Sequence, residues 1–423
     1  MLQLQKIREN RDQIIERLAV KNFKATGLVD EIIELDNTRR NSQKELDDIL
    51  ALSNQLAKEI GNHYAKGEPG KAELAKQESL KLKAAAKAIE PLLMDTVELL
   101  NAKLIELPNL PHTSVPKGKT PEDNEIIYEE GVMPRLPENA VPHWDLASTY
   151  KIVDFELGNK VTGAGFPFYR GKGARLQRAL INFFLDEAIE AGYIEYQPPL
   201  LVNAASGYGT GQLPDKEGQM YFAPEDNLYL IPTAEVPLTN IYRDVIVKEI
   251  DFPIKNVAYS NCFRREAGSY GKDVRGLNRL HQFDKVEIVQ IQHPDKSYQT
   301  LEEMKEHVAG LLRKLELPFR ILRLCGGDMS FTSALTYDFE VFSAAQNRWL
   351  EVSSVSNFED FQANRMKLRF KDKEGKTRLA HTLNGSALAL PRVVAALLEN
   401  NQSAKGIKIP DALTSYTGFK FID

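Results

Sequence analysis

The sequence contains little cysteine, no long apolar run and no strong excess of charge. Its two cysteines, Cys262 and Cys325, cannot form a disulfide framework, and their scarcity favours a reducing compartment. The longest apolar run near the C-terminus, residues 393–398, is far shorter than the roughly 20 residues that a membrane helix needs. The opening MLQLQKIREN is too polar for a signal peptide. We therefore expect a soluble cytoplasmic protein with no membrane partner.

The formal net charge of −5 gives no global indication of nucleic acid binding, so any such surface must be local. Common chemical signatures are missing too, since the sequence has no GxxxxGK[ST], GxGxxG, HExxH or CxxC. The seven histidines are scattered without ligand spacing and predict no zinc site. Residues 207–212 (GYGTGQ) lack a following lysine and helix. We expect a mobile loop there rather than a phosphate cradle.

The first part of the chain has the composition of a long helical hairpin. Residues 30–60 contain neither glycine nor proline and carry apolar side chains at three-to-four-residue spacing, although this seam is poor over residues 36–44. A break opens at Gly61 and closes at residues 67–70 (GEPG), and a second glycine-free run extends over residues 71–107. Two such helices predict an antiparallel coiled-coil arm roughly 50 Å long, at about 1.5 Å per residue.

We assign residues 1–110 to this arm, 111–144 to a proline-rich connector and 145–423 to a second domain. Hydrophobic residues make up 43% of the chain, enough for a large core. In the second domain, short β-branched and aromatic runs such as KVEIVQI alternate with helical patterns. They predict an antiparallel sheet with flanking helices, an α+β fold.

Arginines and carboxylates are concentrated in the strand-like segments of this domain. Arg264 and Glu266 share strand parity and should point to one face, where a surface salt bridge is the ordinary explanation. Glu351 begins a run of hydroxyl side chains (EVSSVSN), and Arg392 lies inside an otherwise apolar helix. A buried arginine usually has an anionic partner, so an anionic ligand is the alternative explanation.

Together these segments resemble bacterial-type seryl-tRNA synthetases, a family of class II aminoacyl-tRNA synthetases. Similar blocks occur in the order of that family: TGQLP, IPTAEVPLTN, FRREAGSYGKDVRGLNRLHQFDKVE, TYDFEV, EVSSVSNFEDFQ and HTLNGSALALPR. GYIEYQPPLLV resembles class II motif 1, through which the family forms homodimers, and LDNTRRNSQKELDDILALSNQLAKEIG resembles the arm. The resemblance implies a serine–tRNA ligase. Such an enzyme joins L-serine to ATP as seryl-adenylate and transfers serine to the 3′-terminal adenosine of tRNA(Ser), and by extension of tRNA(Sec).

The resemblance also implies the residues of an ATP site. Arg264 would grip the α-phosphate and the serine carboxylate, and Arg392 the γ-phosphate. Phe283 and Leu280 would wall the adenine, whose amino group Glu266 would meet. Glu351 and Ser354 would hold Mg²⁺ through oxygen ligands. The remaining ATP-binding positions are Arg265, Val352 and Ser353, and we expect Arg264, Glu351 and Arg392 to be catalytic.

Serine recognition is implied for a small polar pocket that needs no editing domain. Its residues would be Thr233, Ala234, Glu235, Arg264, Glu287 and Ser386. Glu287 would take up the amino group or the hydroxyl of serine. Because alanine and glycine would leave buried polar groups unpaired, such a pocket can discriminate on the order of 10⁴-fold.

The second helix of the arm carries Lys71, Lys76, Lys81, Lys83 and Lys87. Against them stand Glu73 and Glu78, a local excess of three positive charges. A solvated helix face explains these lysines equally well. The resemblance implies instead that they lie against the long variable arm of tRNA(Ser), reading backbone shape and charge.

Four positions depart from the usual family pattern: Val355, Phe342, Asn364 and Arg265. None removes a residue with an expected catalytic role. Two rival hypotheses are a relative that loads a carrier protein, which would lack the arm, and a non-catalytic paralogue acting as a binding protein. The paralogue should have lost Arg264, Glu351 or Arg392, and all three are present.

Overall fold

The computed structural model describes residues 1–267 and 275–423. The loop expected inside FRREAGSYGKDVRGLNRLHQFDKVE falls largely on residues 268–274 and so lies outside the described residues. Contacts divide the chain into two compact units, which we describe separately. The arm unit consists of residues 1–19 and 23–108, and the sheet unit of residues 20–22 and 109–423.

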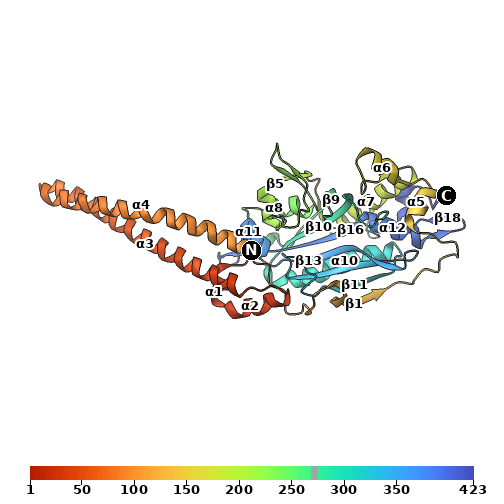
Figure 1. The fold of residues 1–423 in the computed structure, drawn as a ribbon, viewed down its shortest axis with the longest axis horizontal. Coiled ribbons are helices and arrows are strands. Elements are labelled where there is room, and N and C mark those ends of the chain that lie inside the picture. Colours follow the sequence, from red (N-terminus) through yellow and green to blue (C-terminus); the bar gives the residue numbers. More distant parts are fainter. Residues whose placement is uncertain (268–274) are drawn as a thin grey trace. The chain divides into compact units, whose positions relative to one another are not determined.

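The arm unit is entirely helical, with α1 (Leu4–Glu9), α2 (Arg11–Val20), α3 (Thr26–Ala65) and α4 (Pro69–Glu106). Helices α3 and α4 run alongside each other (Figure 1), which confirms the predicted hairpin. The break expected at Gly61 is wrong, because α3 continues to Ala65. A single glycine costs a helix only about 1 kcal/mol, which a helix of this length tolerates. Helix α4 likewise continues through Pro91.

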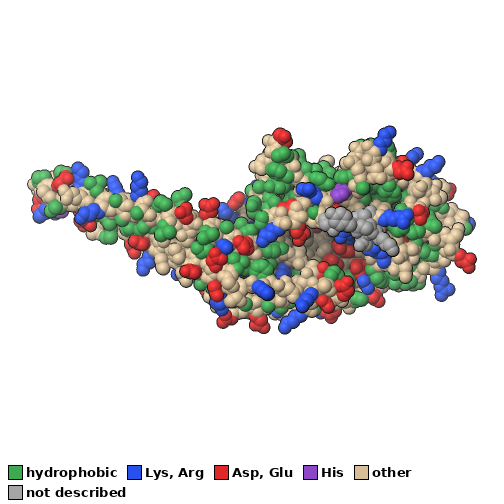
Figure 2. Space-filling model, in the orientation of Figure 1, with side chains coloured by type: hydrophobic (Ala, Val, Ile, Leu, Met, Phe, Trp, Pro, Cys, Tyr) green, Lys and Arg blue, Asp and Glu red, His purple; other side chains and the backbone are tan. Residues whose placement is uncertain are grey.

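The helices of the arm unit are joined by a mixture of apolar and polar contacts. Near the turn that follows α2, Val29 and Ile32 of α3 are fully buried. The poor seam begins at Asp36, whose fully buried carboxylate pairs with Arg8 of α1 and with Arg39 at 2.7 Å. Burial opposes ionisation of Asp36, but the two arginines outweigh it and lower its pKa. On the outer surface, acidic and basic side chains are interspersed (Figure 2).

The sheet unit is built on one eight-stranded sheet of order β1-β11-β12-β13-β16-β10-β9-β4. All its pairings are antiparallel except that of β4 with β9, which confirms the predicted antiparallel sheet. The strands are β1 (Glu125–Glu130), β4 (Ile194–Glu195), β9 (Ile254–Phe263), β10 (Gln282–Gln292), β11 (Phe319–Arg323), β12 (Leu335–Ser343), β13 (Arg348–Asn357) and β16 (His381–Ala389). Strand β1 comes from the proline-rich stretch and pairs with β11.

Three long helices, α7 (Lys172–Glu190), α10 (Ser297–Lys314) and α12 (Leu390–Asn400), share the main apolar core with the sheet. Alternation along β10 explains which side chains join them. Val286 and Ile288 belong to this core, whereas Val289 belongs to a second core with Ala234 and Ala258. Lys285 and Glu287 share the parity of Val289, so they project from the face opposite the three helices.

Shorter elements complete the sheet unit (Figure 1). The helices are α5 (His143–Thr149), α6 (Phe155–Val161), α8 (Ala204–Thr210), α9 (Glu235–Asn240), α11 (Phe361–Met366) and α13 (Asp411–Thr417), with short 3₁₀ turns η1 (Pro121–Asp123), η2 (Glu249–Asp251) and η4 (Pro294–Lys296). The small sheets pair β2 (Val153–Asp154) with β3 (Phe168–Tyr169), β5 (Leu201–Asn203) with β7 (Leu228–Leu230) and β6 (Phe222–Ala223), β15 (Thr377–Leu379) with β14 (Arg369–Lys371) and β8 (Ile246–Lys248), and β17 (Gln402–Ser403) with β18 (Gly406–Lys408) and β19 (Phe421–Ile422). Among the described helices, none is both long and apolar enough to cross a membrane.

The loop expected at residues 207–212 is wrong, because most of it belongs to α8. The Asn203 side chain caps this helix by accepting a hydrogen bond from the Ser206 amide at 2.9 Å. Gly211, at φ +94°, ends it in the left-handed region. An Asn cap and a terminal Gly are the usual helix boundaries, so this short helix carried a signal that the glycine content obscured.

Candidate active site

The buried carboxylate of Glu287 is the centre of a polar cluster. Glu287 lies on β10 directly opposite Ser386 on β16. It forms an ion pair with Lys285 and accepts hydrogen bonds from Thr233 Oγ1 at 3.2 Å and Asn384 Nδ2 at 3.1 Å. Ser386 Oγ lies 3.5 Å from it. The structure thus brings together Thr233, Glu287 and Ser386, three of the residues expected to bind serine.

A second buried carboxylate, Glu235, begins α9 beside this cluster. Its backbone amide donates to Thr233 Oγ1 at 3.2 Å, and its Oε1 accepts from Gln362 Nε2 at 2.7 Å. Burial, reinforced by the negative charge of Glu287, raises the pKa of Glu235 to about 7. Ala234 is fully buried in the second core, so its side chain serves packing.

Arg264 follows the last residue of β9 and lies beside Phe283 on β10. Its guanidinium is 5.2 Å from the centre of the Phe283 ring, and its Nε donates to Pro232 O at 3.3 Å. Its backbone amide donates to His281 O at 2.9 Å, which continues the β9–β10 ladder. Leu280, expected at the adenine site, is 5% exposed and belongs to the main core.

The parity prediction for Arg264 and Glu266 is wrong. Strand β9 ends at Phe263, and Glu266 adopts a positive φ of 48°, so strand alternation no longer applies there. Glu266 pairs with Arg279 at 2.7 Å instead of Arg264. The neighbouring Arg265 is held through its backbone amide, which donates to Gln219 O at 2.8 Å.

Arg392 and Glu351 meet at the start of α12. Arg392 Nη1 donates to the backbone oxygen of Glu351 at 2.7 Å and lies 3.5 Å from its carboxylate. Ser354 is opposite Asp338 in the β12–β13 ladder. The Oδ1 atom of Asp338 is buried without a hydrogen-bond partner, and burial together with the charge of Glu351 raises its pKa well above the ordinary value. Val352 is buried, and Ser353 Oγ donates to Ser386 O at 2.5 Å.

The oxygen atoms here suit a hard divalent cation. Glu351 and Ser354 offer a carboxylate and a hydroxyl, and the unpartnered Asp338 oxygen lies beside them. Within residues 1–267 and 275–423, no group of three histidine, cysteine or carboxylate side chains is placed to hold a metal ion. Such a cation would therefore need water or phosphate oxygens to complete its shell.

Known families match both units of the chain. The seryl-tRNA synthetase N-terminal domain matches residues 1–111, and the class II core domain of tRNA synthetases for G, H, P, S and T matches residues 221–401. The chain is 51% identical to the serine–tRNA ligase of Salinibacter ruber, over 99% of this chain and 98% of that protein. It is 47% identical to that of Methylacidiphilum infernorum, over 98% and 99%.

The chain belongs to the seryl-tRNA synthetase family. A crystal structure of the seryl-tRNA synthetase from Pyrococcus horikoshii, complexed with ATP, superimposes with a TM-score of 0.93 and 34% identity over 99% of each chain. The cytoplasmic serine–tRNA ligase of Naegleria fowleri, in complex with AMP, superimposes with a TM-score of 0.88 and 25% identity over 100% of this chain and 99% of that one. The resemblance inferred from the motifs is confirmed, as are the class II fold and the enzyme class, an ATP-dependent ligase.

A buried hydrogen-bond network supports Arg392 in this seryl-tRNA synthetase fold. Arg392 Nε donates to Asn278 O, and Asn278 Nδ2 donates to Gln346 Oε1, both at 2.9 Å. Gln346 Nε2 donates to Glu399 Oε1 at 2.9 Å, which also accepts from His143 Nδ1 at 2.7 Å. Burial opposes ionisation of Glu399, but hydrogen bonds led by that of His143 outweigh it and lower its pKa. The network links the segment before β10 to helix α12.

His143 also sets the backbone that precedes Asn278. The amide of Leu277 donates to His143 Nε2 at 2.8 Å, so the ring carries its hydrogen on Nδ1. Gly276, at φ +67°, lies so close that a β-carbon would be 2.3 Å from His143 Nε2. Only glycine fits at that position.

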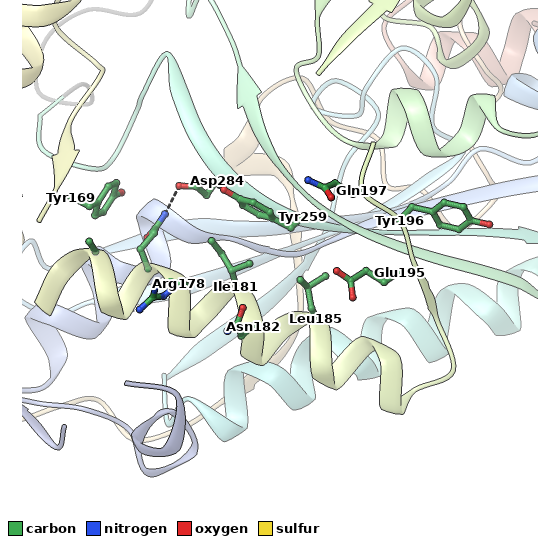
Figure 3. Close-up of a pocket in the computed structure, with 12 residues that line it drawn as sticks. Tyr169, Arg178, Ile181, Asn182, Leu185, Glu195, Tyr196, Gln197, Tyr259 and Asp284 are labelled. Carbon is green, nitrogen blue, oxygen red and sulfur yellow. Dashed lines mark hydrogen bonds between the residues drawn. The ribbon is translucent and has the colours of Figure 1, made fainter. Parts of the chain in front are cut away.

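A cavity of about 550 Å³ lies on the opposite face of the sheet, beside α7 (Figure 3). Asp284 accepts hydrogen bonds there from Gln177 Nε2 at 2.7 Å and Tyr259 OH at 2.6 Å. None of the residues expected to bind serine or ATP lines it. Because Asp284 follows Phe283 directly, strand alternation sends the two side chains to opposite faces.

Sequence reasoning missed several polar residues of the site. Lys285 shares strand parity with Glu287, and Asn384 with Ser386, so the alternation rule could have found both. Gln362 and Gln346 carry no such signal, because their partners are distant in sequence.

Proposed function

We propose that this protein is a serine–tRNA ligase. It activates L-serine with ATP to seryl-adenylate and transfers serine to the 3′-terminal adenosine of tRNA(Ser), and also of tRNA(Sec). The observation that carries the proposal is the small, polar, buried Glu287 cluster, next to which Arg264 donates to Pro232 O, in the residue before Thr233. The names of the relatives support the same reaction.

Activation needs positioning and charge neutralisation more than proton transfer. A serine carboxylate oxygen attacks the α-phosphorus of ATP; an O–P bond forms, and the bond to pyrophosphate breaks. The nucleophile is already an anion, so no general base is required. Arg264 neutralises the α-phosphate, Arg392 the γ-phosphate, and Phe283 stacks on adenine. Glu351 and Ser354 would hold Mg²⁺, whose charge would offset that of the phosphates.

The two buried carboxylates divide the recognition of serine. Because the charge of Glu287 is already balanced by Lys285, Glu287 is suited to accept a hydrogen bond from the neutral hydroxyl of serine. Thr233 and Ser386 lie close to Glu287. Gln362, which donates to Glu235, is a neutral amide, so the charge of Glu235 is available for the ammonium group of serine. Alanine would leave the buried polar groups around Glu287 without the hydrogen bond that the serine hydroxyl makes, and threonine would be excluded by size.

The arm unit is the proposed tRNA-binding element. Lys71 pairs with Glu68 at 2.9 Å, and Lys81 pairs with Glu78 at 3.1 Å. Both lysine side chains are largely exposed. Exposed pairs of this kind contribute little to stability, so their exchange for phosphate contacts is inexpensive. The lysines of α4 would track the tRNA backbone rather than base edges.

We also propose that the enzyme is a cytoplasmic homodimer joined through the motif 1 face. Apolar side chains stay exposed at the end of α7 and along the motif 1 segment: Ile189, Ile194, Leu200 and Leu201. An exposed apolar surface of this kind is typically buried in a protein–protein interface, here with a second copy of the chain. Sedimentation analysis should give twice the mass of the chain, and a single-chain mass would contradict the interface.

Serine-dependent exchange of labelled pyrophosphate into ATP tests the reaction. Alanine, glycine, threonine and cysteine serve as parallel substrates. Exchange with serine alone is expected. No exchange with any amino acid, on folded protein with Mg²⁺, would favour the non-catalytic paralogue. Exchange with another amino acid would keep the ATP site and overturn the roles of Thr233, Glu235 and Glu287.

A further inference from the structure

Gln362 is a buried amide whose nitrogen and oxygen both have hydrogen-bond partners. It lies on α11 and is 1% exposed. Its Nε2 donates to Glu235 Oε1 at 2.7 Å and to Thr210 O at 3.1 Å, and its Oε1 accepts from Thr382 Oγ1 at 2.7 Å. A flipped amide would place its oxygen against two acceptors, so the orientation is fixed.

Of the groups that favour the charged form of Glu235, Gln362 has the largest influence. The charges of Glu287 and Lys285 on β10 and of Arg264 after β9 also shift the pKa of Glu235, without a hydrogen bond. Burial has the greatest influence on the pKa of Glu235 and keeps the carboxylate close to half-ionised near neutral pH. The hydrogen bond from Gln362 opposes burial and favours the charged form. Gln362 therefore affects both the orientation of the Glu235 carboxylate and its ionisation.

We propose that Gln362 is a positioning residue for serine recognition: anchored by Thr210 and Thr382, its amide occupies Glu235 Oε1 and directs Oε2 to the serine ammonium group. The inference rests on the proposed function, because it takes Glu235 as part of the serine pocket. Gln362 touches no substrate itself and acts only through Glu235. It adds a second layer to the pocket, contributed by the helix that follows β13.

The direct test is the near-isosteric variant Gln362→Met, assayed by pyrophosphate exchange. The lost hydrogen bond to a charged group should raise the KM for serine roughly 10- to 100-fold. The KM for ATP and kcat at saturating serine should stay within about twofold, because neither Arg264 nor Arg392 contacts Gln362. A matched control is Gln299→Met, which removes an exposed amide that donates to Glu303 at 2.9 Å and should leave both KM values unchanged.

A pH profile separates positioning from a merely structural role. Serine binding should strengthen as pH rises through about 7, where Glu235 ionises. Removal of the Gln362 donor raises the pKa of Glu235 further, so in Gln362→Met the inflection in KM for serine should move to higher pH. A structural role alone would weaken binding at every pH without moving the inflection.

A milder variant keeps the inference testable if Gln362→Met does not fold. Thr382→Val removes only the hydroxyl that anchors Gln362, and should raise the KM for serine about threefold with an upward shift of the inflection. Unchanged serine KM and pH profile in the folded variants, with normal serine exchange in the parent, would overturn the role of Gln362 alone. Absent serine exchange in the parent would overturn the proposed function and this inference together.

Discussion

Helix α4 of the arm unit and strand β10 of the sheet unit handle charged residues in opposite ways. In the arm, lysines and glutamates pair on exposed helix surfaces, with Lys81–Glu78 as an example at 3.1 Å. In the sheet unit, Lys285 and Glu287 form an ion pair with both side chains almost completely buried. Buried pairs strongly penalise the loss of one partner, whereas exposed pairs contribute little. The lysines on the surface of α4 are therefore free for a partner, while Lys285 and Glu287 are held in a fixed geometry.

The largest effect should come from Arg264, because it bears on chemistry rather than on stability. Arg264→Ala should lower serine-dependent pyrophosphate exchange about 1000-fold, the usual scale for a lost charge-stabilising group in an active site. Binding of tRNA(Ser) by the same variant should be nearly unchanged, since the proposed tRNA-binding element is the arm. Arg313→Ala, which removes a half-buried arginine paired with Glu130 at 2.7 Å, is the control and should retain exchange. Equal losses in both variants would refute the role of Arg264.

A stability comparison of the two ion pairs measures the contrast directly. Glu287→Gln leaves Lys285 buried without its anion and should lower the free energy of unfolding of the sheet unit by about 3 kcal/mol. Lys81→Ala removes an exposed pair and should change stability by less than about 1 kcal/mol. In urea denaturation, tryptophan fluorescence reports the sheet unit, because both tryptophans, Trp144 and Trp349, lie there, and the circular dichroism of the helices reports the arm unit as well. Similar changes in the two variants would abolish the distinction.

The same contrast explains what could be predicted from the sequence. The arm helices follow from local periodicity, and only their ends were misjudged, since Gly61 continues the helix. The antiparallel sheet also follows from local pattern. The pairing of Glu287 with Ser386 depends on register between β10 and β16, which alternation alone does not specify.

Failures of prediction occurred where the backbone leaves regular structure or where contacts are distant. Glu266 escapes the strand rule because its φ is positive, and it pairs with Arg279. Gln362 reaches Glu235 through a tertiary contact that no periodicity encodes. Thr233, Glu287 and Ser386 were expected only because the motifs resemble a known family.

Salt should distinguish the ligands of the two units. If about three lysine–phosphate contacts form on the arm, raising salt from about 50 to 200 mM should weaken tRNA(Ser) binding roughly 20-fold. Binding of serine should change far less, because its pocket is buried. Replacing Lys83 and Lys87 by alanine should reduce the salt slope by roughly 1.5 to 2. Filter binding of labelled tRNA measures the slope; an unchanged slope in this variant would place the tRNA contacts elsewhere.

The smallest effect should come from the hydrogen-bond network behind Arg392, because Gln346 reaches Arg392 only through Asn278. Gln346→Leu removes the bonds to Asn278 and Glu399 but leaves His143 paired with Glu399. Asn278 would then hold Arg392 less firmly, and the KM for ATP should rise about threefold, the value of one neutral hydrogen bond. The KM for serine should not change, because Glu235 and Glu287 lie outside this network. Pyrophosphate exchange at varied ATP measures the effect. An equal rise in both KM values would mean that Gln346 supports the fold as a whole rather than the orientation of Arg392.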